Sequence, residues 1–185
     1  MALAAKQHVM NRAEFLEWET SQTEKHDYWQ GEIFNMTGAR QVHVNITLNV
    51  AVLLKQHLRG SGCRAYMADM QLEVESADAV FYPDVFVSCR PEDLAADRVL
   101  HHPKVIIEVL SDSTAAYDRG QKFSTYRSID SLQEFVLIDP DRRTLEIYRR
   151  TDSNDWLLAT NDSALGLTLK SIDFSADLAA VFEDA

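Results

Sequence analysis

The spacing of apolar positions predicts two helices in the first third of the chain. Over residues 41–58, apolar side chains recur every three or four positions and Gly60 follows the last of them, a pattern typical of an amphipathic helix and its end. A shorter helix is expected over residues 12–20, because Asn11 can cap its N-terminus and Glu14 stands three positions later. Both helices would turn one apolar face toward a core.

Alternating stretches and apolar runs predict the strands. Residues 28–36 alternate well enough for one strand, in which Glu32 stands among apolar neighbours. Residues 64–74 and 80–88 flank a polar break and are expected to pair as antiparallel strands. Residues 104–110 form a continuous apolar run, which is typical of a strand covered on both faces at the centre of a sheet.

The second half of the chain predicts a crossover connection. Polar residues 111–114 precede a helix expected over residues 115–127, and two strands are expected over residues 135–139 and 144–150 on either side of a turn. A strand, a helix and a second strand in this order normally place the two strands parallel in one sheet.

Length and composition fit one globular domain. The 185 residues are 46% hydrophobic and 25% charged, the balance of a folded globular protein, and neither a repeat nor a linker divides residues 1–185. A last short helix is expected over residues 176–182, with Ser175 as its N-cap. Together the elements predict an α/β (α+β) fold with a mixed sheet and flanking helices.

The sequence also bears on location and on cysteine chemistry. No stretch approaches the roughly 18 apolar residues that a spanning helix needs, so no membrane partner is expected. The first eight residues lack the charged and apolar regions of a secretory signal, which predicts a cytoplasmic protein.

Cys63 and Cys89 have neither CxxC nor Cys/His ligand spacing, so two buried thiols are expected, with no disulfide and no zinc site.

Two acidic residues stand out because they lie inside apolar strands. Asp84 follows Pro83 in one predicted strand, and Glu108 interrupts the continuous apolar run of another. A carboxylate in such a setting needs a partner to offset its desolvation, and two neighbouring strands could bring both acids together. A divalent cation between them would make their proximity tolerable, and oxygen ligands favour Mg²⁺ or Mn²⁺ over zinc.

Four motifs carry a resemblance to a known family. They read YPDV over residues 82–85, IIEVLSDST over residues 106–114, DRGQKFSTY over residues 118–126 and EFVLIDP over residues 134–140. Their order and spacing resemble the Uma family of restriction endonucleases, within the PD-(D/E)xK nuclease superfamily. The resemblance extends over about two-thirds of the chain, residues 28–148.

The resemblance implies a restriction-endonuclease-like core and a metal-dependent endonuclease. Asp84 and Glu108 would bind Mg²⁺ or Mn²⁺, with the main-chain carbonyl of Val109 as a third ligand, and a lysine would activate water for hydrolysis of phosphodiester bonds in DNA. Bound metal lowers the pKa of water and neutralises charge that grows on the phosphate.

The chain departs from the superfamily pattern at the lysine. A residue two positions after Glu108 shares its face of the strand, and that residue is Leu110, which can neither donate nor accept a proton. Lys122 is the best candidate to supply the cation, because the helix after residue 114 doubles back along the sheet. The Uma pattern also carries a lysine at this position.

Each candidate has a structural alternative. Asp118 and Lys122 are spaced i, i+4, which also permits an ordinary surface ion pair. Glu32 resembles the acid that an N-terminal element adds to the site in this superfamily, but it could equally be an exposed strand charge. His43 is close to the start of the long helix, where a surface position is the simpler expectation.

Net charge separates three hypotheses about function. The chain carries 18 basic and 29 acidic residues, a formal charge of −11, which disfavours binding of a polyphosphate unless basic residues gather locally. A homodimer would join two such basic strips, as in many nucleases that cut both strands. The alternatives are a catalytically degenerate binding or assembly module of the same fold and a phosphoesterase for small substrates.

Overall fold

Two β-sheets form the framework of the computed structural model, which describes residues 10–36, 38–112, 114–159 and 166–185. In the described residues the larger sheet has six strands, in the order β11 (Trp156–Leu158), β10 (Thr144–Arg150), β9 (Glu134–Asp139), β8 (Pro103–Val109), β6 (Val85–Ser88) and β3 (Arg64–Met67). The smaller has five, in the order β2 (Glu32–Asn35), β1 (His26–Trp29), β5 (Ala79–Phe81), β4 (Gln71–Val74) and β7 (Val99–Leu100).

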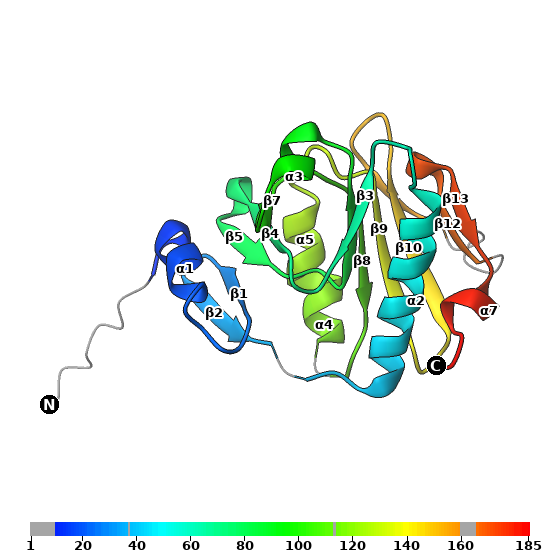
Figure 1. The fold of residues 1–185 in the computed structure, drawn as a ribbon, viewed down its shortest axis with the longest axis horizontal. Helices are drawn as coiled ribbons and strands as arrows, with labels where there is room; N and C mark the ends of the chain where they lie inside the picture. Colours follow the sequence, from blue (N-terminus) through cyan, green and yellow to red (C-terminus); the bar gives the residue numbers. More distant parts are fainter. Residues whose placement is uncertain (1–9, 37, 113, 160–165) are drawn as a thin grey trace, which may run out of the picture.

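Helices cover both sheets and fill the space between them (Figure 1). The long α2 (Gln41–His57) and the short α7 (Leu178–Val181) pack on one face of the six-stranded sheet, together with the hairpin β12 (Leu167–Leu169) and β13 (Phe174–Ala176). A helical segment packs between the other face and the five-stranded sheet; it consists of α4 (Ala115–Tyr117), the π-helical η2 (Asp118–Lys122) and α5 (Phe123–Tyr126). The remaining helices are α1 (Arg12–Glu19), α3 (Pro91–Ala95), η1 (Glu75–Ala77) and η3 (Lys170–Ile172).

One antiparallel pair of chain segments belongs to both sheets. β3 pairs with β6 in the larger sheet, and the continuations of the same two segments, β4 and β5, pair in the smaller one. The break on the second segment falls at Pro83, which fixes its own φ and has no N–H to donate to a ladder. The sequence predicts two continuous strands here; the antiparallel pairing is confirmed, but each strand is divided, and Asp84 lies at the division.

Several other predicted elements are confirmed. Asn11 caps α1 in a reciprocal capping box with Glu14, and α2 begins at Gln41 as predicted. The apolar run is the central strand β8, which pairs in parallel with β9 across the helical crossover, and β9 pairs antiparallel with β10.

Two further predicted elements differ from the structure. Residues 28–36 are not one strand but part of the hairpin β1–β2, because Gln30 and Gly31 both have positive φ, 47° and 90°, as a tight two-residue turn requires. The C-terminal helix is also shorter than predicted: residues 174–176 form β13, and Asp177 precedes a helix of only four residues.

The prediction of two free thiols is wrong. Cys63 and Cys89 form a disulfide with a Cα separation of 4.0 Å. The cause is strand register: Arg64 pairs with Ser88 in the β3–β6 ladder, so the cysteines that extend the two strands stand opposite one another. Sequence spacing carries no trace of this pairing.

Among the described residues no helix is long and apolar enough to cross a membrane, and the sequence prediction about a secretory signal falls outside them, on residues 1–8.

Candidate active site

Asp84 and Glu108 lie side by side on neighbouring strands. Val85 pairs with Ile107 in the antiparallel β6–β8 ladder, which brings the residues just beyond that pair to the same end of the sheet. The Asp84 backbone N–H donates to Glu108 Oε2 at 3.1 Å, and the Val109 backbone N–H donates to Asp84 Oδ2 at 2.7 Å. Each acid is thus fixed by the backbone of the other strand, as the sequence predicts for their proximity.

The helical segment adds a buried lysine and a tyrosine to Glu108. Lys122 Nζ lies 3.3 Å from Glu108 Oε1, and Tyr126 Oη donates to the same oxygen at 2.8 Å. Lys122 ends the π-helical turn, a widened turn that often occurs at functional sites. The residue is only 6% exposed, so its ion pair with Asp118, at 3.7 Å, is not the ordinary surface pair that the spacing also permits.

A fourth acid reaches the cluster from β1. Asp27 Oδ2 lies 3.3 Å from Lys122 Nζ, and Asp27 Oδ1 accepts a hydrogen bond of 3.0 Å from the Tyr82 backbone N–H. Sequence analysis expects this N-terminal acid at Glu32. The structure instead leaves Glu32 exposed on the edge strand β2, where the described residues give it no hydrogen bond or ion pair to the cluster.

His43 approaches the cluster from α2. Its Nε2 lies 3.2 Å from Asp84 Oδ2, its ring also hydrogen-bonds the main-chain carbonyl of Val109, and its side chain is 16% exposed. The surface position that the sequence favours is therefore wrong. The histidine contacts the two groups, a carboxylate and a carbonyl, that the family resemblance presents as metal ligands.

The charges of the cluster are unbalanced. Burial, together with Asp84 and Asp118, raises the pKa of Glu108 to about 8 against the lowering effect of Lys122. Burial also raises the pKa of Asp27 and Asp118. The acids outnumber the basic groups: the former are Asp27, Asp84, Glu108 and Asp118, and the latter are Lys122 and His43.

Burial alone would lower the pKa of Lys122, but Asp27, Glu108 and Asp118 outweigh it and hold that pKa well above its ordinary value. Burial likewise lowers the pKa of His43, and Asp84 reverses the shift so that the pKa lies above its usual value. The cluster therefore raises the pKa of both its basic groups and favours their charged forms. Its donors are oxygens, the ligands that Mg²⁺ and Mn²⁺ prefer, so the residues present fit a hard divalent cation.

Leu110 stands where the superfamily pattern has a lysine, but its side chain carries no charge and cannot exchange a proton. It lies on the same face of β8 as Glu108 and is buried in the apolar core between the sheets. Lys122 reaches Glu108 from the other side of that core. The cation beside Glu108 thus comes from the helical segment.

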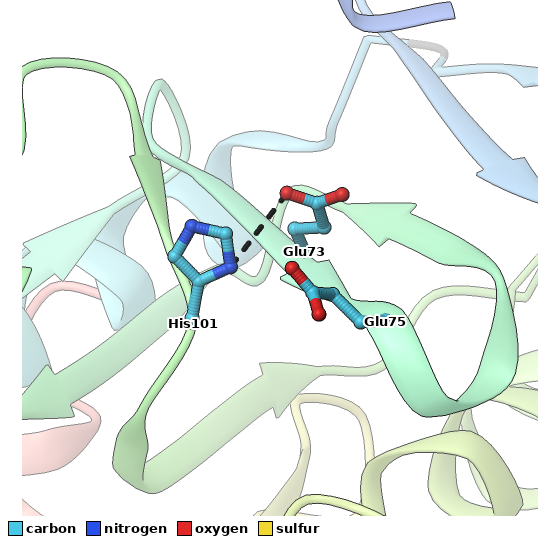
Figure 2. Close-up of side chains that lie close together, drawn as sticks. All are labelled: Glu73, Glu75 and His101. Atoms are coloured by element: carbon cyan, nitrogen blue, oxygen red, sulfur yellow. Dashed lines mark ion pairs between the residues drawn. The ribbon is translucent and has the colours of Figure 1, made fainter. Parts of the chain in front are cut away.

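A second group of potential ligands lies apart from this cluster. Figure 2 shows Glu73 on β4 and His101 just after β7 pointing toward one another, with Glu75 beside them, and the three offer ligand atoms within 4.8 Å of one another. Glu73 lies in register with Val80, which packs with Tyr28 on the outer face of the smaller sheet. Asp27 points to the opposite face, and an ion pair with Arg12 already compensates the charge of Glu73.

A cavity of about 560 Å³ lies at the opposite end of the larger sheet, lined in part by Arg90, His102 and Lys104. Lys104 is near the beginning of β8 and Glu108 is near its end. The cavity is therefore separate from the acidic cluster, and the chemistry of the cluster does not depend on it.

Comparisons with known proteins agree with the architecture and the motifs. The family model of Uma2, described as "Putative restriction endonuclease", matches residues 12–178. Two relatives from Synechocystis sp., "Uncharacterized protein slr1290" and "Uncharacterized protein sll1609", are 35% and 34% identical to this chain; the matches cover 88% and 85% of this chain and 85% and 90% of the relatives.

A solved structure shares the fold. It is described as a "putative nuclease belonging to DUF820" from Anabaena variabilis and superposes with a TM-score of 0.75 at 19% identity, over 94% of this chain and 97% of that one. This likeness, together with the mixed sheets and flanking helices of this chain, confirms the restriction-endonuclease-like fold class predicted from the motifs. The chain belongs to the Uma2 family of restriction-endonuclease-like proteins.

Proposed function

We propose that this protein hydrolyses phosphodiester bonds of DNA with the help of Mg²⁺ or Mn²⁺. The observation that carries the proposal is the contact of Asp84 and Glu108 at the end of two paired strands, with Lys122 within 3.3 Å of Glu108. Asp84, Glu108 and the carbonyl of Val109 would hold the ion. A bound divalent ion supplies a nucleophile from water at neutral pH and neutralises charge on the phosphate.

Lys122 acts as a fixed positive charge in this proposal. Its raised pKa keeps the ammonium protonated, so in the metal-free protein it donates hydrogen bonds and does not accept a proton. Asp27 and Asp118 hold the ammonium on the side of Glu108. An ammonium in this position can orient an attacking water or stabilise a phosphate oxygen as negative charge develops.

The more exposed side of the cluster is the side from which a substrate would approach. The side chains of Asp84 and His43 are 18% and 16% exposed, whereas that of Glu108 is 3% exposed. His43, whose pKa Asp84 raises against the lowering effect of burial, lies on that side as well. A phosphate group arriving there would meet His43 and Asp84 first, and Lys122 would remain behind Glu108.

Net charge supports a second candidate. A formal charge of −11 opposes binding of duplex DNA, so a degenerate binding module of the same fold would keep the sheets and lack the metal. A phosphoesterase for small substrates is the third outcome, since an acidic surface repels a small diester less than a polymer.

The test is cleavage of supercoiled plasmid and of a small chromogenic phosphodiester with Mg²⁺, with Mn²⁺ and with chelator. We expect metal-dependent nicking that Asp84→Asn abolishes and Glu73→Gln preserves, because Glu73 is a carboxylate outside the cluster. Thermal melting adds an independent measure, since a metal that binds only the folded protein raises the midpoint. A midpoint that millimolar metal leaves unchanged in the wild type, with plasmid intact, would contradict the proposal and favour the module.

A further inference from the structure

Two cavities meet at the disulfide between Cys63 and Cys89. Cys89 lines the cavity of about 560 Å³, and Cys63 lines a second one of about 540 Å³. Both lie where β3 begins and β6 ends, because Arg64 pairs with Ser88 in the ladder of these strands. This is the end of the larger sheet opposite to the acidic cluster.

Basic side chains line both cavities, three in each. Those of the smaller cavity are Lys55, Arg59 and Arg64, and those of the larger are Arg90, His102 and Lys104. None of the six forms an ion pair with the described part of the chain. In a chain with a formal charge of −11, these six residues form a local basic surface.

Acidic groups near this basic surface leave its charge largely uncompensated. Asp130 is the only acid among the described residues that line either cavity. Asp93 on α3 is buried, and its carboxylate already accepts hydrogen bonds from the Ser88 hydroxyl and from the backbone N–H groups of His101 and His102. The basic surface therefore has free positive charge to offer to an external anion.

The other lining residues indicate how such an anion would be held. Gln133 adds a side-chain amide to the larger cavity, and an amide can donate a hydrogen bond to an oxygen of the anion. No Phe, Tyr or Trp occurs among the described residues that line the two cavities, so there is no platform on which unpaired bases could stack. These groups suit the phosphates of a nucleic acid better than its bases.

We propose that the basic surface binds the backbone of duplex DNA at a site separate from the acidic cluster. The identity of the polymer rests on the proposed function, hydrolysis of DNA. A compact anion would occupy one cavity and leave the three basic residues of the other unused, whereas phosphates that repeat along a chain would reach both. Contacts of this kind position the DNA and carry no sequence information.

The position of the basic surface assigns it a role in affinity and not in chemistry. Lys55 follows His43 by 12 residues on α2, a distance of about 18 Å along the helix axis. The phosphate at the acidic cluster is therefore not the one that the basic surface holds. A long DNA bound at this surface would instead have a raised concentration near the cluster, which offsets the repulsion from the acidic chain.

Fluorescence anisotropy with a labelled duplex of about 30 base pairs, in chelator, measures this binding at several salt concentrations. Each lost phosphate contact makes the dependence of log affinity on log salt shallower by about 1. We expect this change for Lys55→Gln and for Lys104→Gln, and a change of about 2 for the double variant. Arg98→Gln is the matched control, because Arg98 is also exposed but lines neither cavity, and it should bind as the wild type does.

Three results of this titration would overturn the proposal. The first is a wild type that does not bind the duplex at roughly 50 mM salt. The second is an effect of only one of the two lysines, which would confine the anion to one cavity. The third is displacement of the duplex by inorganic phosphate or by poly-glutamate as effectively, per charge, as by unlabelled duplex, which would assign the surface to a compact anion or to an acidic protein.

Two further measurements separate this proposal from the proposed hydrolysis. Asp84→Asn should bind the duplex in chelator as tightly as the wild type. With metal, the variant Lys55→Gln, Lys104→Gln should need more plasmid for half-maximal nicking and should cleave the small chromogenic diester at the wild-type rate. Salt-dependent binding without any nicking would contradict the hydrolysis alone. Nicking whose plasmid dependence ignores both lysines would contradict the role of the basic surface alone.

Discussion

The ammonium of Lys122 lies 3.3 Å from the carboxylate of Asp27, although one residue belongs to the helical segment and the other to the smaller sheet. Both side chains are buried. A buried acid that loses its only nearby cation is left uncompensated, and this costs about 3–5 kcal/mol. The pair therefore joins the helical segment to the smaller sheet through charge as well as through packing.

The first prediction concerns this pairing. Lys122→Met keeps the length of the side chain and removes the charge, so we expect the free energy of unfolding to fall by about 3–5 kcal/mol, lessened where Asp27 takes up a proton. Urea unfolding at pH 7 in chelator measures it. Arg142→Met, which removes a basic side chain that is 78% exposed, should change the same free energy by less than about 0.5 kcal/mol. Equal effects of the two variants would show that the burial of Lys122 has no energetic consequence.

The second prediction is a pH dependence of stability in the absence of metal. Glu108 has a pKa of about 8 in the folded protein, against an ordinary value of 4.5. Between these values the folded protein binds more protons than the unfolded chain, so the contribution of Glu108 to stability falls as pH rises through this window. Glu108→Gln cannot ionise and lacks this contribution.

The measurement is urea unfolding of the wild type and of Glu108→Gln from pH 5 to pH 9 with chelator present. The free energy of unfolding of the wild type minus that of Glu108→Gln should decrease steadily as pH rises. The decrease should level off above about pH 8. Parallel curves for the two proteins would mean that Glu108 has the same pKa in the folded and the unfolded state.

The third prediction concerns the disulfide. Cys63 and Cys89 are separated by 26 residues, and closing a loop of this length in the unfolded chain stabilises the folded state by about 3 kcal/mol. Reduction should therefore lower the free energy of unfolding of the wild type by roughly that amount. The double variant Cys63→Ser, Cys89→Ser should be less stable than the oxidised wild type and should not respond to reductant. A wild type whose stability is the same with and without reductant would contradict the pairing.

The sequence predicts those parts of the candidate site that lie within or next to the strands of the larger sheet. Asp84 and Glu108 could be predicted because a carboxylate in an apolar stretch of the sequence is conspicuous. Strand alternation also predicts that Leu110 shares a face with Glu108. Lys122 follows from the crossover that returns the helical segment to the sheet. These inferences need only local periodicity and the pairing of adjacent strands.

The rest depends on tertiary structure. Asp27 reaches the cluster only because Gln30 and Gly31 turn the chain back, which fixes the face of β1 to which the acid points. His43 reaches it because the apolar face of α2 docks on the larger sheet and turns the first helical turn toward Asp84. Neither the turn nor the docking angle is encoded in the residues next to these side chains, so sequence analysis selects Glu32 and leaves His43 on the surface.

The fourth prediction moves the lysine back to the superfamily position. Leu110 shares its face of β8 with Glu108 and is buried in the core that Lys122 also borders. The proposed chemistry needs one ammonium beside Glu108. A fixed positive charge acts through its position, so it should matter little whether the helical segment or β8 supplies this ammonium. Lys122→Met should reduce plasmid nicking by about 100-fold, and Leu110→Lys in that background should recover about tenfold.

The matched control is Leu110→Met with Lys122→Met, which fills the same space without a charge and should recover nothing. Both double variants must remain folded by circular dichroism, because Leu110 is part of the core. A folded Leu110→Lys, Lys122→Met protein that nicks no faster than its control would show that the helical segment contributes more than a charge. The contacts of Lys122 with Asp27 and Asp118 would then be required to aim the ammonium, because a lysine on β8 would reach Glu108 from a different direction.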